Sequence, residues 1–388
     1  MTVCFETFGC RLNKAESLQM EAEYLAKGWK TTSVHRDADL FVVRGCSVTR
    51  RAQEDCEKLI AHLKHRYPAK KVLVCGCLSQ ATRSAPRENP ANDDVPVPTR
   101  TARAYLKVQD GCAGKCTFCI VPKFRGPSQS VDFVRVLDRA KRFVEAGYHE
   151  IVVTGCNLAL YASQGKRLHD LLLALADIDS GCRIRLGSVE PGECLLDTVH
   201  AMAARPNVCR FLHLPIQSGS NRLLKAMRRP YQLRDVDELV KTATQLMPDL
   251  GLGCDLMVGF PDESDLDFAA TVGLLKRHCF SNVHVFRYSK RPGTTAAGFP
   301  NQIAREIKSS RAHELKDLAS AARRKFARSF VGKTVEVVVE DEKKGTGWTG
   351  EYLPCKIKGS AVHRKELVQA RTFKSTGDQL FARLIPRQ

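Results

Sequence analysis

The stretch of sequence that decides the fold prediction is residues 108–126, which read VQDGCAGKCTFCIVPKFRG. Its three cysteines, Cys112, Cys116 and Cys119, have the spacing C-x3-C-x2-C and are called the loop cysteines below. Thiolates are soft ligands, and three of them on one tight loop can hold three irons of a four-iron (4Fe-4S) cluster, with the fourth iron open to a substrate or cofactor. Structural zinc is the alternative. A closed zinc site needs a fourth ligand, however, and no second Cys-x2-Cys or His-x3-His pair follows nearby.

Around this loop, from residue 104 to about residue 290, apolar segments typical of strands alternate with helical segments. Six β/α units in succession predict a partial TIM-type (β/α)6 barrel, with a doubly wound sheet as the alternative. The cysteine loop follows the first strand, which is where a barrel carries its chemistry. The six expected strands are Ala104–Gln109, Glu150–Thr154, Arg183–Gly187, Arg210–Leu214, Gly251–Met257 and Asn282–Arg287.

The segments outside this barrel have other patterns. Residues 1–83 predict a small parallel α/β domain, in which Asn13 and Glu16 form a capping box for the first helix. Residues 84–103 are rich in proline and predict a linker. The central domain, 104–330, ends in a long basic helix that begins at Ala304. Residues 331–388 alternate with a period of two between glycine-rich turns, which predicts a small all-β barrel and gives an α/β protein of three domains.

Three further cysteines, Cys10, Cys46 and Cys77, each follow a predicted strand of the N-terminal domain and are called the N-terminal cysteines below. Because loops that follow parallel strands converge at one edge of a sheet, these three thiols can meet there. Cys75, two residues before Cys77, is an alternative third member, although it also fits a buried strand thiol.

The composition excludes some classes of protein and favours others. The 388 residues include 61 Lys and Arg against 42 Asp and Glu, a net charge of +19, and 16 cysteines. No apolar run is long enough for a membrane span, and Glu6 interrupts the place of an export signal, so we expect a cytoplasmic protein with reduced thiols. So many reduced cysteines favour metal or redox chemistry over a disulfide framework. The charge favours a nucleic-acid partner, with a basic enzyme that binds none as the alternative.

These motifs resemble the methylthiotransferase family of radical S-adenosylmethionine (SAM) enzymes. Residues 108–126 closely resemble its signature, and the region from 331 to 388 is similar to a TRAM domain, which binds RNA in this family. The residues before Cys46 depart from the pattern, since Arg44-Gly45 stands where relatives usually carry Asn-Thr. The other matching motifs are FGCRLN (8–13), RGCSVT (44–49), CGCLSQ (75–80), TGCNLALY (154–161), RLGSVEP (185–191), HLPIQSGSNRLLKAM (213–227), DLMVGFPDE (255–263) and HVFRYSKRPGT (284–294).

The resemblance implies an enzyme with two 4Fe-4S clusters and SAM. The loop cysteines would hold the cluster that cleaves SAM to a 5′-deoxyadenosyl radical, which abstracts hydrogen from an unreactive C–H bond. The N-terminal cysteines would hold an auxiliary cluster that supplies sulfur, and a second SAM would methylate this sulfur. No catalytic residue beyond the cluster ligands is expected.

Two groups of side chains are candidate contacts for SAM and RNA. Polar groups after the barrel strands suit the amino acid, ribose and sulfonium of SAM. Each of them has loop capping as an alternative role. An aromatic ring in the cysteine loop suits adenine. Basic residues beside an aromatic suit phosphate contact and base stacking. The SAM candidates are Phe118, Thr154, Gly155, Ser188, Glu190, Gln217, Ser218 and Asp255, and the RNA candidates are Lys343, Lys344, Trp348, Lys356 and Lys358.

The family divides by substrate. The segments TFGCRLN (7–13) and AMRRPY (226–231) look most like the threonylcarbamoyl branch. We therefore predict methylthiolation at carbon 2 of N6-threonylcarbamoyladenosine beside the tRNA anticodon, by a monomer whose other partners are SAM, a sulfur donor and an electron donor. The alternatives are isopentenyladenosine in tRNA, and an aspartate of a ribosomal protein, which the +19 charge disfavours. Two alternatives differ from this prediction in more than the substrate: a radical SAM enzyme with one cluster, and a non-catalytic RNA-binding protein with a structural metal.

Overall fold

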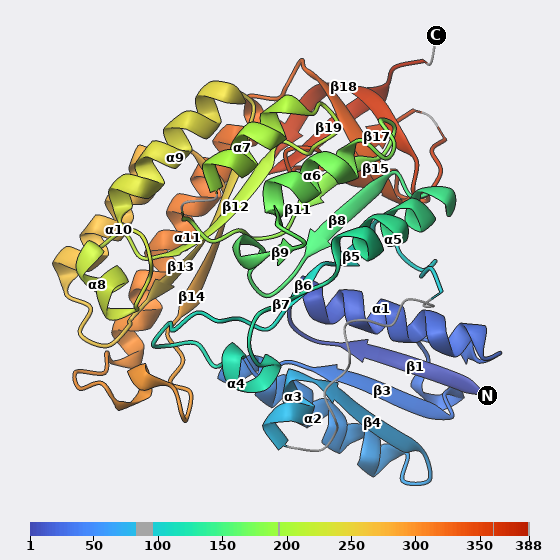
Figure 1. Cartoon of the computed structure of the whole chain (residues 1–388), viewed down its shortest axis with the longest axis horizontal. Coiled ribbons are helices and arrows are strands. Elements are labelled where there is room, and N and C mark those ends of the chain that lie inside the picture. Colours follow the sequence, from blue (N-terminus) through green and yellow to red (C-terminus); the bar gives the residue numbers. More distant parts are fainter. Residues whose placement is uncertain (83–95, 193–194, 360, 387–388) are drawn as a thin grey trace.

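The computed structural model describes residues 1–82, 96–192, 195–359 and 361–386. Residues 84–95 of the expected linker lie outside these ranges. Figure 1 shows a sheet that carries the N-terminus at one end of the molecule, curved strands in the middle, and a barrel near the C-terminus at the other end.

The N-terminal sheet has four parallel strands in the order β2 (Lys30–Thr31), β1 (Thr2–Thr7), β3 (Leu40–Gly45) and β4 (Lys71–Gly76). Successive side chains of a strand point to opposite faces of the sheet, and apolar residues occur at both kinds of position, so both faces are apolar. Helix α1 (Arg11–Ala26) packs on the face that carries Val3 and Phe5, and helix α2 (Arg50–Arg66) packs on the face that carries Phe41 and Val43. The N-terminal cysteines follow β1, β3 and β4 at one edge of this sheet.

The expected capping box is wrong. Asn13 lies inside α1, which begins after Cys10, and its amide donates to the carbonyl oxygens of Phe8 at 2.8 Å and Gly45 at 3.2 Å. Glu16 is buried on the same helix and pairs with Arg44. Both side chains therefore hold the loops after neighbouring strands together, instead of closing the start of the helix.

The central layer has six parallel strands in sequence order. Strands β5 (Ala104–Lys107), β8 (Glu150–Thr154) and β11 (Arg183–Leu186) form one sheet, and β12 (Phe211–Gln217), β13 (Gly251–Val258) and β14 (Phe280–Arg287) form another. Parallel bridges from Ile184 to Val208 and from Ser188 to His213 join the two sheets. The order never reverses, as it must in a doubly wound sheet, so the six expected strands form a partial barrel.

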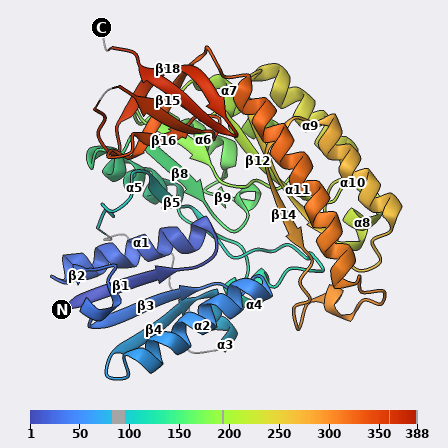
Figure 2. The same cartoon turned by 180° about the vertical axis from the view of Figure 1, so that it is seen from behind.

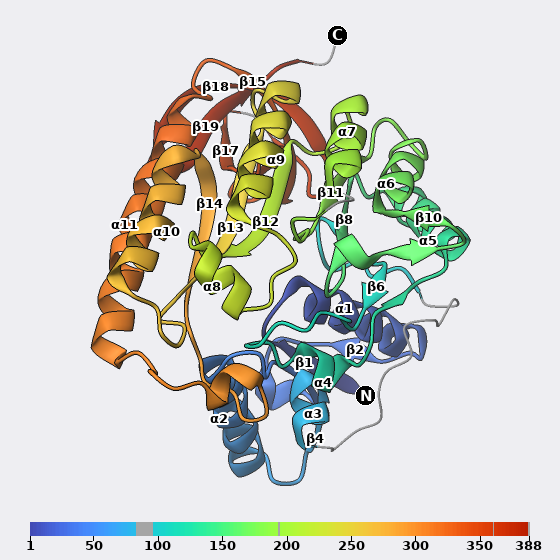
Figure 3. The ribbon, with the colours of Figure 1, turned by 60° about the vertical axis from the view of Figure 1, so that its left-hand side comes forward.

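Helices cover the outer side of these strands (Figure 3). They are α5 (Phe133–Glu145), α6 (Leu168–Ala176), α7 (Leu195–Ala204), α9 (Leu233–Leu246) and α10 (Asp265–Arg277), whose apolar faces pack on the strands in one large core. The short elements are η1 (His35–Asp37), α3 (Cys77–Thr82), β6 (Gln109–Asp110), α4 (Val121–Arg125), β7 (Gln129–Ser130), η2 (Leu158–Leu160), β9 (Ala162–Ser163), β10 (Lys166–Arg167), α8 (Asn221–Ala226) and η3 (Thr295–Gly298). None of the helices in the described ranges is both long and apolar enough to span a membrane.

The C-terminal part follows the expected pattern. The long basic helix α11 (Arg305–Arg328) lies beside β14 and leads to the barrel, as Figure 2 shows from behind. Five strands close this barrel, in the order β15 (Thr334–Asp341), β16 (Thr346–Thr349), β17 (Pro354–Lys358), β19 (Gln379–Leu384) and β18 (Leu367–Thr376).

Buried charges join the C-terminal barrel to the central strands. Glu150 is fully buried, and its carboxylate accepts hydrogen bonds from Arg183 and Arg185, with Arg103 at 3.6 Å. The two arginines of β11 then donate across the junction to backbone carbonyls. Arg183 reaches Glu336 and Trp348 of the barrel, and Arg185 reaches Thr349 and Gly350.

Candidate cluster and cofactor site

The loop cysteines lie between β6 and α4, where the chain folds back on itself. The backbone N–H of Cys112 donates to the carbonyl of Gly126 at 3.1 Å, which closes the loop. Gly111 has a φ of +63°, and a Cβ there would lie 1.9 Å from the carbonyl oxygen of Pro127, so only glycine allows this close approach.

The thiols of this loop are partly buried and near enough to interact electrostatically. Burial, together with the neighbouring thiols of Cys116 and Cys112, raises the pKa of Cys119 to about 12. The backbone N–H of Gly114 donates to the sulfur of Cys112 at 3.3 Å, and a Cβ on Gly114 would lie 3.1 Å from the same sulfur. The glycine therefore supplies a donor for a thiolate and leaves the space beside it free of a side chain.

An arginine outside the loop contacts one of these thiols. Arg229 donates to the sulfur of Cys116 at 3.3 Å and pairs with Glu190 at 2.8 Å, while Asn157 donates to the other oxygen of Glu190 at 2.6 Å. The carboxylate of Glu190 also lies near Cys112, where it disfavours the thiolate. The sequence motif AMRRPY (226–231) contained Arg229, but its role was missed because the contact spans 113 residues.

The SAM candidates lie at two depths of the barrel. Six of them share the edge that carries the loop cysteines. Thr154 ends β8 and Gly155 follows it, Ser188 and Glu190 follow β11, and Gln217 ends β12 and Ser218 follows it. Gln217 has a φ of +74°, a strained conformation for a residue other than glycine, which is typical of functional sites. Ser218 is fully buried and accepts from the N–H of Ser220.

Phe118 and Asp255 have other surroundings. The ring of Phe118 packs against an apolar cluster that includes Met227, Phe260 and Tyr288. Asp255 lies deeper along β13, and its carboxylate accepts from His213 at 3.0 Å and His284 at 3.2 Å. Burial raises the pKa of this carboxyl, but the two histidines outweigh burial and hold it well below its usual range.

The N-terminal cysteines converge at the edge of their sheet. Cys46 and Cys77 are buried and Cys10 is exposed; burial raises the pKa of Cys46 to about 11, with the thiols of Cys77 and Cys10 adding to the shift. A Cβ on Gly9 would lie 2.9 Å from the sulfur of Cys46, so the glycine clears a space beside it. Cys75 instead packs in the apolar core under α1, with its thiol directed toward the carbonyl of Val43.

Arg125 connects the two cysteine sets. It belongs to the segment that follows the loop cysteines, and its Nε donates to the sulfur of Cys77 at 3.3 Å. Its other nitrogens bond to both carboxylate oxygens of Glu16, to Asn13 and to Asp110. Sequence reasoning missed this residue too, although it stands in the run KFRG (123–126) at the end of the cysteine loop.

Glu16 is the centre of this junction. Burial raises the pKa of its carboxyl, but Arg125, Lys107 and Arg44 surround it and hold the pKa well below its usual range. Arg44 thus explains the departure noted before Cys46, because it is a buried partner of Glu16 at 3.0 Å. A network of five charged side chains therefore connects the N-terminal sheet to the central strands: Glu16, Arg44, Lys107, Asp110 and Arg125.

The donor chemistry of both cysteine sets, three thiols each, is compatible with an iron–sulfur cluster. Within the described ranges, neither set has three sulfur atoms within 4.8 Å of one another. A tetrahedral zinc ion would hold its sulfurs about 3.8 Å apart, given Zn–S bonds of about 2.3 Å. Three thiols spread more widely than this, beside space cleared by Gly114 or Gly9, suit a larger metal group.

The RNA candidates lie on the C-terminal barrel. Lys343 and Lys344 are exposed in the turn between β15 and β16, and Lys358 is exposed at the end of β17. Trp348 is engaged at the junction with the central strands, where its ring stacks on Tyr352 at 4.7 Å and its N–H donates to Glu340. Lys356 is partly buried on β17.

Comparison with known proteins gives the family. Residues 106–275 match the radical SAM superfamily, and residues 2–97 match an uncharacterized protein family, UPF0004. The solved structure of the radical SAM methyltransferase TsrM from Kitasatospora setae is 11% identical and superposes with a TM-score of 0.56, covering 76% of this chain and 73% of its own, which shows a shared fold.

Relatives of known function cover almost the whole chain. Threonylcarbamoyladenosine tRNA methylthiotransferase MtaB of Aquifex aeolicus is 30% identical over 92% of this chain and 97% of its own length. tRNA-2-methylthio-N(6)-dimethylallyladenosine synthase of Cereibacter sphaeroides is 32% identical over 92% of this chain and 90% of its own. The chain therefore belongs to the radical SAM tRNA methylthiotransferases of the MiaB and MtaB type, a family that uses a 4Fe-4S cluster and SAM to modify tRNA.

Proposed function

We propose that this enzyme adds a methylthio group to carbon 2 of N6-threonylcarbamoyladenosine beside the anticodon of tRNA. The loop cysteines would hold the cluster that binds SAM, and the N-terminal cysteines, with Cys77 in preference to Cys75, would hold a second 4Fe-4S cluster. The observation that carries the two-cluster proposal is the contact of Arg125, a residue of the SAM-cluster loop, with the thiol of Cys77.

When bound, the two clusters and SAM supply a carbon radical and a sulfur atom for the same substrate carbon. The residues of this chain position these groups. Arg229 and Arg125 each donate an N–H to a ligand sulfur, which stabilises the thiolate form and offsets part of the negative charge of a cluster. Cys46 and Cys77 are buried and Cys119 is partly buried, which limits the access of water to these ligands. The SAM candidates at the strand ends would bind the cofactor between the two sets, and a sulfur donor and an electron donor would serve the clusters.

The choice of nucleoside rests on sequence similarity. The segments TFGCRLN (7–13) and AMRRPY (226–231) resemble the threonylcarbamoyl branch, and relatives from three organisms carry that name. Relatives named as dimethylallyladenosine synthases reach the same level of identity, which makes that nucleoside the second candidate. A net charge of +19 supports a tRNA substrate in either case.

We also propose a division of labour along the chain. Residues 1–83 would carry the auxiliary cluster, 104–330 the radical SAM chemistry, and 331–388, as a TRAM-like domain, would bind tRNA. Lys343, Lys344 and Lys358 are the exposed candidates for phosphate contact. On duplex nucleic acid, each phosphate contact adds about 0.9 to the steepness with which the logarithm of the binding constant falls against the logarithm of the salt concentration. Replacing these three lysines should therefore make the binding of tRNA less dependent on salt.

Mass spectrometry of tRNA nucleosides tests the substrate. In a strain that lacks the gene, 2-methylthio-N6-threonylcarbamoyladenosine should disappear and its unmodified precursor should accumulate. A wild-type copy should restore the product, whereas a Cys112→Ala copy should not. Unchanged product, or loss of the methylthio-isopentenyl nucleoside instead, would overturn the proposed substrate.

Iron analysis tests the second cluster. After anaerobic reconstitution we expect about eight irons per chain, and about four in a variant with Cys10, Cys46 and Cys77 replaced by alanine. That variant should still cleave SAM. A Cys75→Ala variant should keep about eight irons, and a wild type with only about four irons would contradict the auxiliary site.

The variant Gly9→Ala should weaken the auxiliary cluster without removing a ligand. Its methyl group would lie 2.8 Å from the Cβ and 2.9 Å from the sulfur of Cys46, at a φ of +96°. We expect iron to fall from about eight toward four per chain, with SAM cleavage retained. Gly28→Ala is the matched control, because Gly28 also has a positive φ, +81°, but has open space around it. Equal iron in both variants would show that the clearance at Gly9 has no role.

A further inference from the structure

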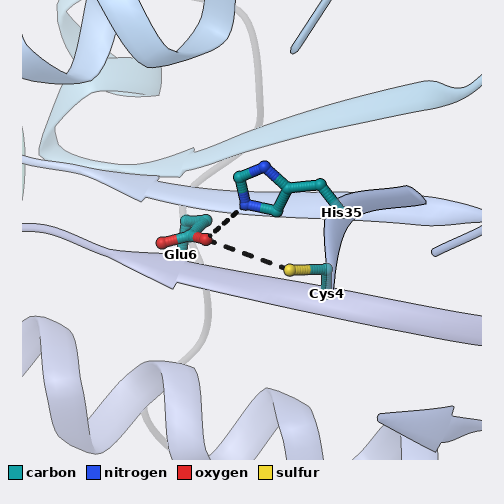
Figure 4. A group of neighbouring side chains, drawn as sticks. All are labelled: Cys4, Glu6 and His35. Atoms are coloured by element: carbon teal, nitrogen blue, oxygen red, sulfur yellow. Dashed lines mark hydrogen bonds and ion pairs between the residues drawn. The ribbon is translucent and has the colours of Figure 1, made fainter. Parts of the chain in front are cut away.

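Cys4, Glu6 and His35 form a separate group of metal-binding side chains. Cys4 and Glu6 are two residues apart on β1, so their side chains leave the same face of the sheet. His35 belongs to η1, the short turn before β3. Figure 4 shows the thiol and the imidazole approaching the carboxylate of Glu6 from two sides.

The three donor atoms meet at one carboxylate oxygen. His35 Nε2 lies 2.8 Å from Glu6 Oε1, and Cys4 Sγ lies 4.0 Å from the same oxygen. All three atoms are within 4.8 Å of one another, which in the described part of the chain holds for only one other group, at Asp255 in the barrel. Cys4 is buried, while the side chains of Glu6 and His35 are about one-third exposed, at 33% and 27%.

These distances fit a zinc ion after small side-chain movements. With bonds of about 2.0–2.1 Å to nitrogen and oxygen and 2.3 Å to sulfur, tetrahedral zinc needs about 3.4 Å between N and O and about 3.6 Å between S and O. The observed 2.8 Å and 4.0 Å differ from these values in opposite directions. A shift of about half an ångström of each flexible side chain satisfies both, and the exposed side leaves the fourth position to water.

The position of His35 is held without a metal. Its ring packs edge-on against Phe41 at 5.7 Å, and Lys70 donates to the carbonyls of His35 and Arg36. A ligand held in this way loses little freedom when an ion binds.

The group is distinct from the N-terminal cysteines. Cys10 lies six positions after Cys4, beyond the end of β1 at Thr7, on the order of 20 Å away if the chain stays extended. It is also chemically distinct, because one thiol, one imidazole and one carboxylate suit zinc, whereas three thiols suit an iron–sulfur cluster. We propose that Cys4, Glu6 and His35 bind one zinc ion, which links η1 to β1 and stabilises the N-terminal sheet.

The test uses the full chain with its clusters reconstituted, supplied with one equivalent of ZnCl2 and desalted. Element analysis should give about one zinc per chain in addition to the iron. The zinc X-ray absorption edge, which is blind to iron, should report one sulfur neighbour at about 2.3 Å and the rest nitrogen or oxygen. Zinc should also raise the Tm of the wild type.

Glu6→Gln keeps the shape of the side chain, and His35→Gln replaces a partly exposed ring, so both variants should fold. Each should bind zinc at least about tenfold more weakly and lose the Tm increase, with iron unchanged. His62→Gln, an exposed histidine of the same domain, is the control and should behave as wild type. Absence of zinc in the wild type, equal zinc in His35→Gln, or three or more sulfur neighbours around zinc would each overturn the site.

Discussion

Replacing Glu150 with glutamine is expected to lower the free energy of unfolding by about 3–5 kcal/mol, the usual effect of breaking a buried ion pair. Glu150 has no exposed surface, and it is the anionic partner of Arg183, Arg185 and, at 3.6 Å, Arg103. Glutamine keeps the size of the side chain but removes the carboxylate that pairs with the buried guanidinium groups of Arg183 and Arg185, while Arg103 keeps Glu340 as its partner at 2.7 Å. Because the same arginines hold the C-terminal barrel, that barrel should detach from the central strands at lower denaturant than in the wild type.

Chemical denaturation followed by tryptophan fluorescence measures this effect, since Trp348 lies at the junction. Asp177→Asn is the matched control, because Asp177 pairs with Arg205 on the surface at 2.7 Å and should change the midpoint little. If Glu150→Gln and Asp177→Asn shifted the midpoint equally, the buried charges would have no special role in stability.

The same carboxyl should make the wild type sensitive to acid. Burial raises the pKa of Glu150, but Arg185, Arg183 and Arg103 outweigh burial and place it well below its usual range. The unfolded chain has a Glu pKa of about 4.3, so the contribution of Glu150 is complete above that pH and is lost as the pH falls toward the folded pKa. Between about pH 5 and pH 3 the stability of the wild type should therefore fall more steeply than that of Glu150→Gln. Parallel curves in this range would contradict the assignment.

Replacing Arg125 with methionine is expected to reduce tRNA methylthiolation about 100-fold while SAM cleavage changes only a few-fold. Arg125 bonds to Cys77, Asn13 and both oxygens of Glu16, so it fixes the distance between the two cysteine sets. A displacement of about 1 Å between reacting groups can cost about 100-fold in rate. In the proposed division of labour SAM cleavage depends on the cluster held by the loop cysteines, and the substitution leaves these three cysteines intact.

The two rates are measured in one reaction, as methylthiolated nucleoside and as 5′-deoxyadenosine. Arg51→Met, at an exposed arginine of α2, is the control for loss of a positive charge. In Arg125→Met, Glu16 still pairs with Arg44 and Lys107, so the variant should fold. Its iron content checks that both clusters are present. If both activities fell equally, Arg125 would act on the loop cysteines. If neither activity fell, Arg125 would have no positioning role.

Local patterns made the main features of this fold predictable. The six central strands follow from apolar segments at regular intervals, and the spacing of Cys112, Cys116 and Cys119 needs no knowledge of the fold. The convergence of Cys10, Cys46 and Cys77 follows from one rule, that loops after parallel strands share an edge. The metal that each set binds, however, stays a prediction.

Side-chain partners distant in sequence were not predictable. Arg125 meets Cys77 across 48 residues and Arg229 meets Cys116 across 113 residues, and no periodicity encodes such pairs. Asn13 illustrates the opposite error, because a sequence pattern typical of a helix cap was used here for a tertiary contact to Gly45. In each case long-range packing at a charged junction outweighed the local signal.

The bonds from Arg183 and Arg185 to the C-terminal barrel end on main-chain oxygens. A carbonyl is the same whichever amino acid carries it, so attachment of the barrel places little demand on the identity of the acceptor residues. Exposed residues of the barrel, Lys343 and Lys344 among them, can therefore change without weakening this attachment. The proposed contact with tRNA can thus evolve independently of the hydrogen bonds that fix the barrel to the central strands.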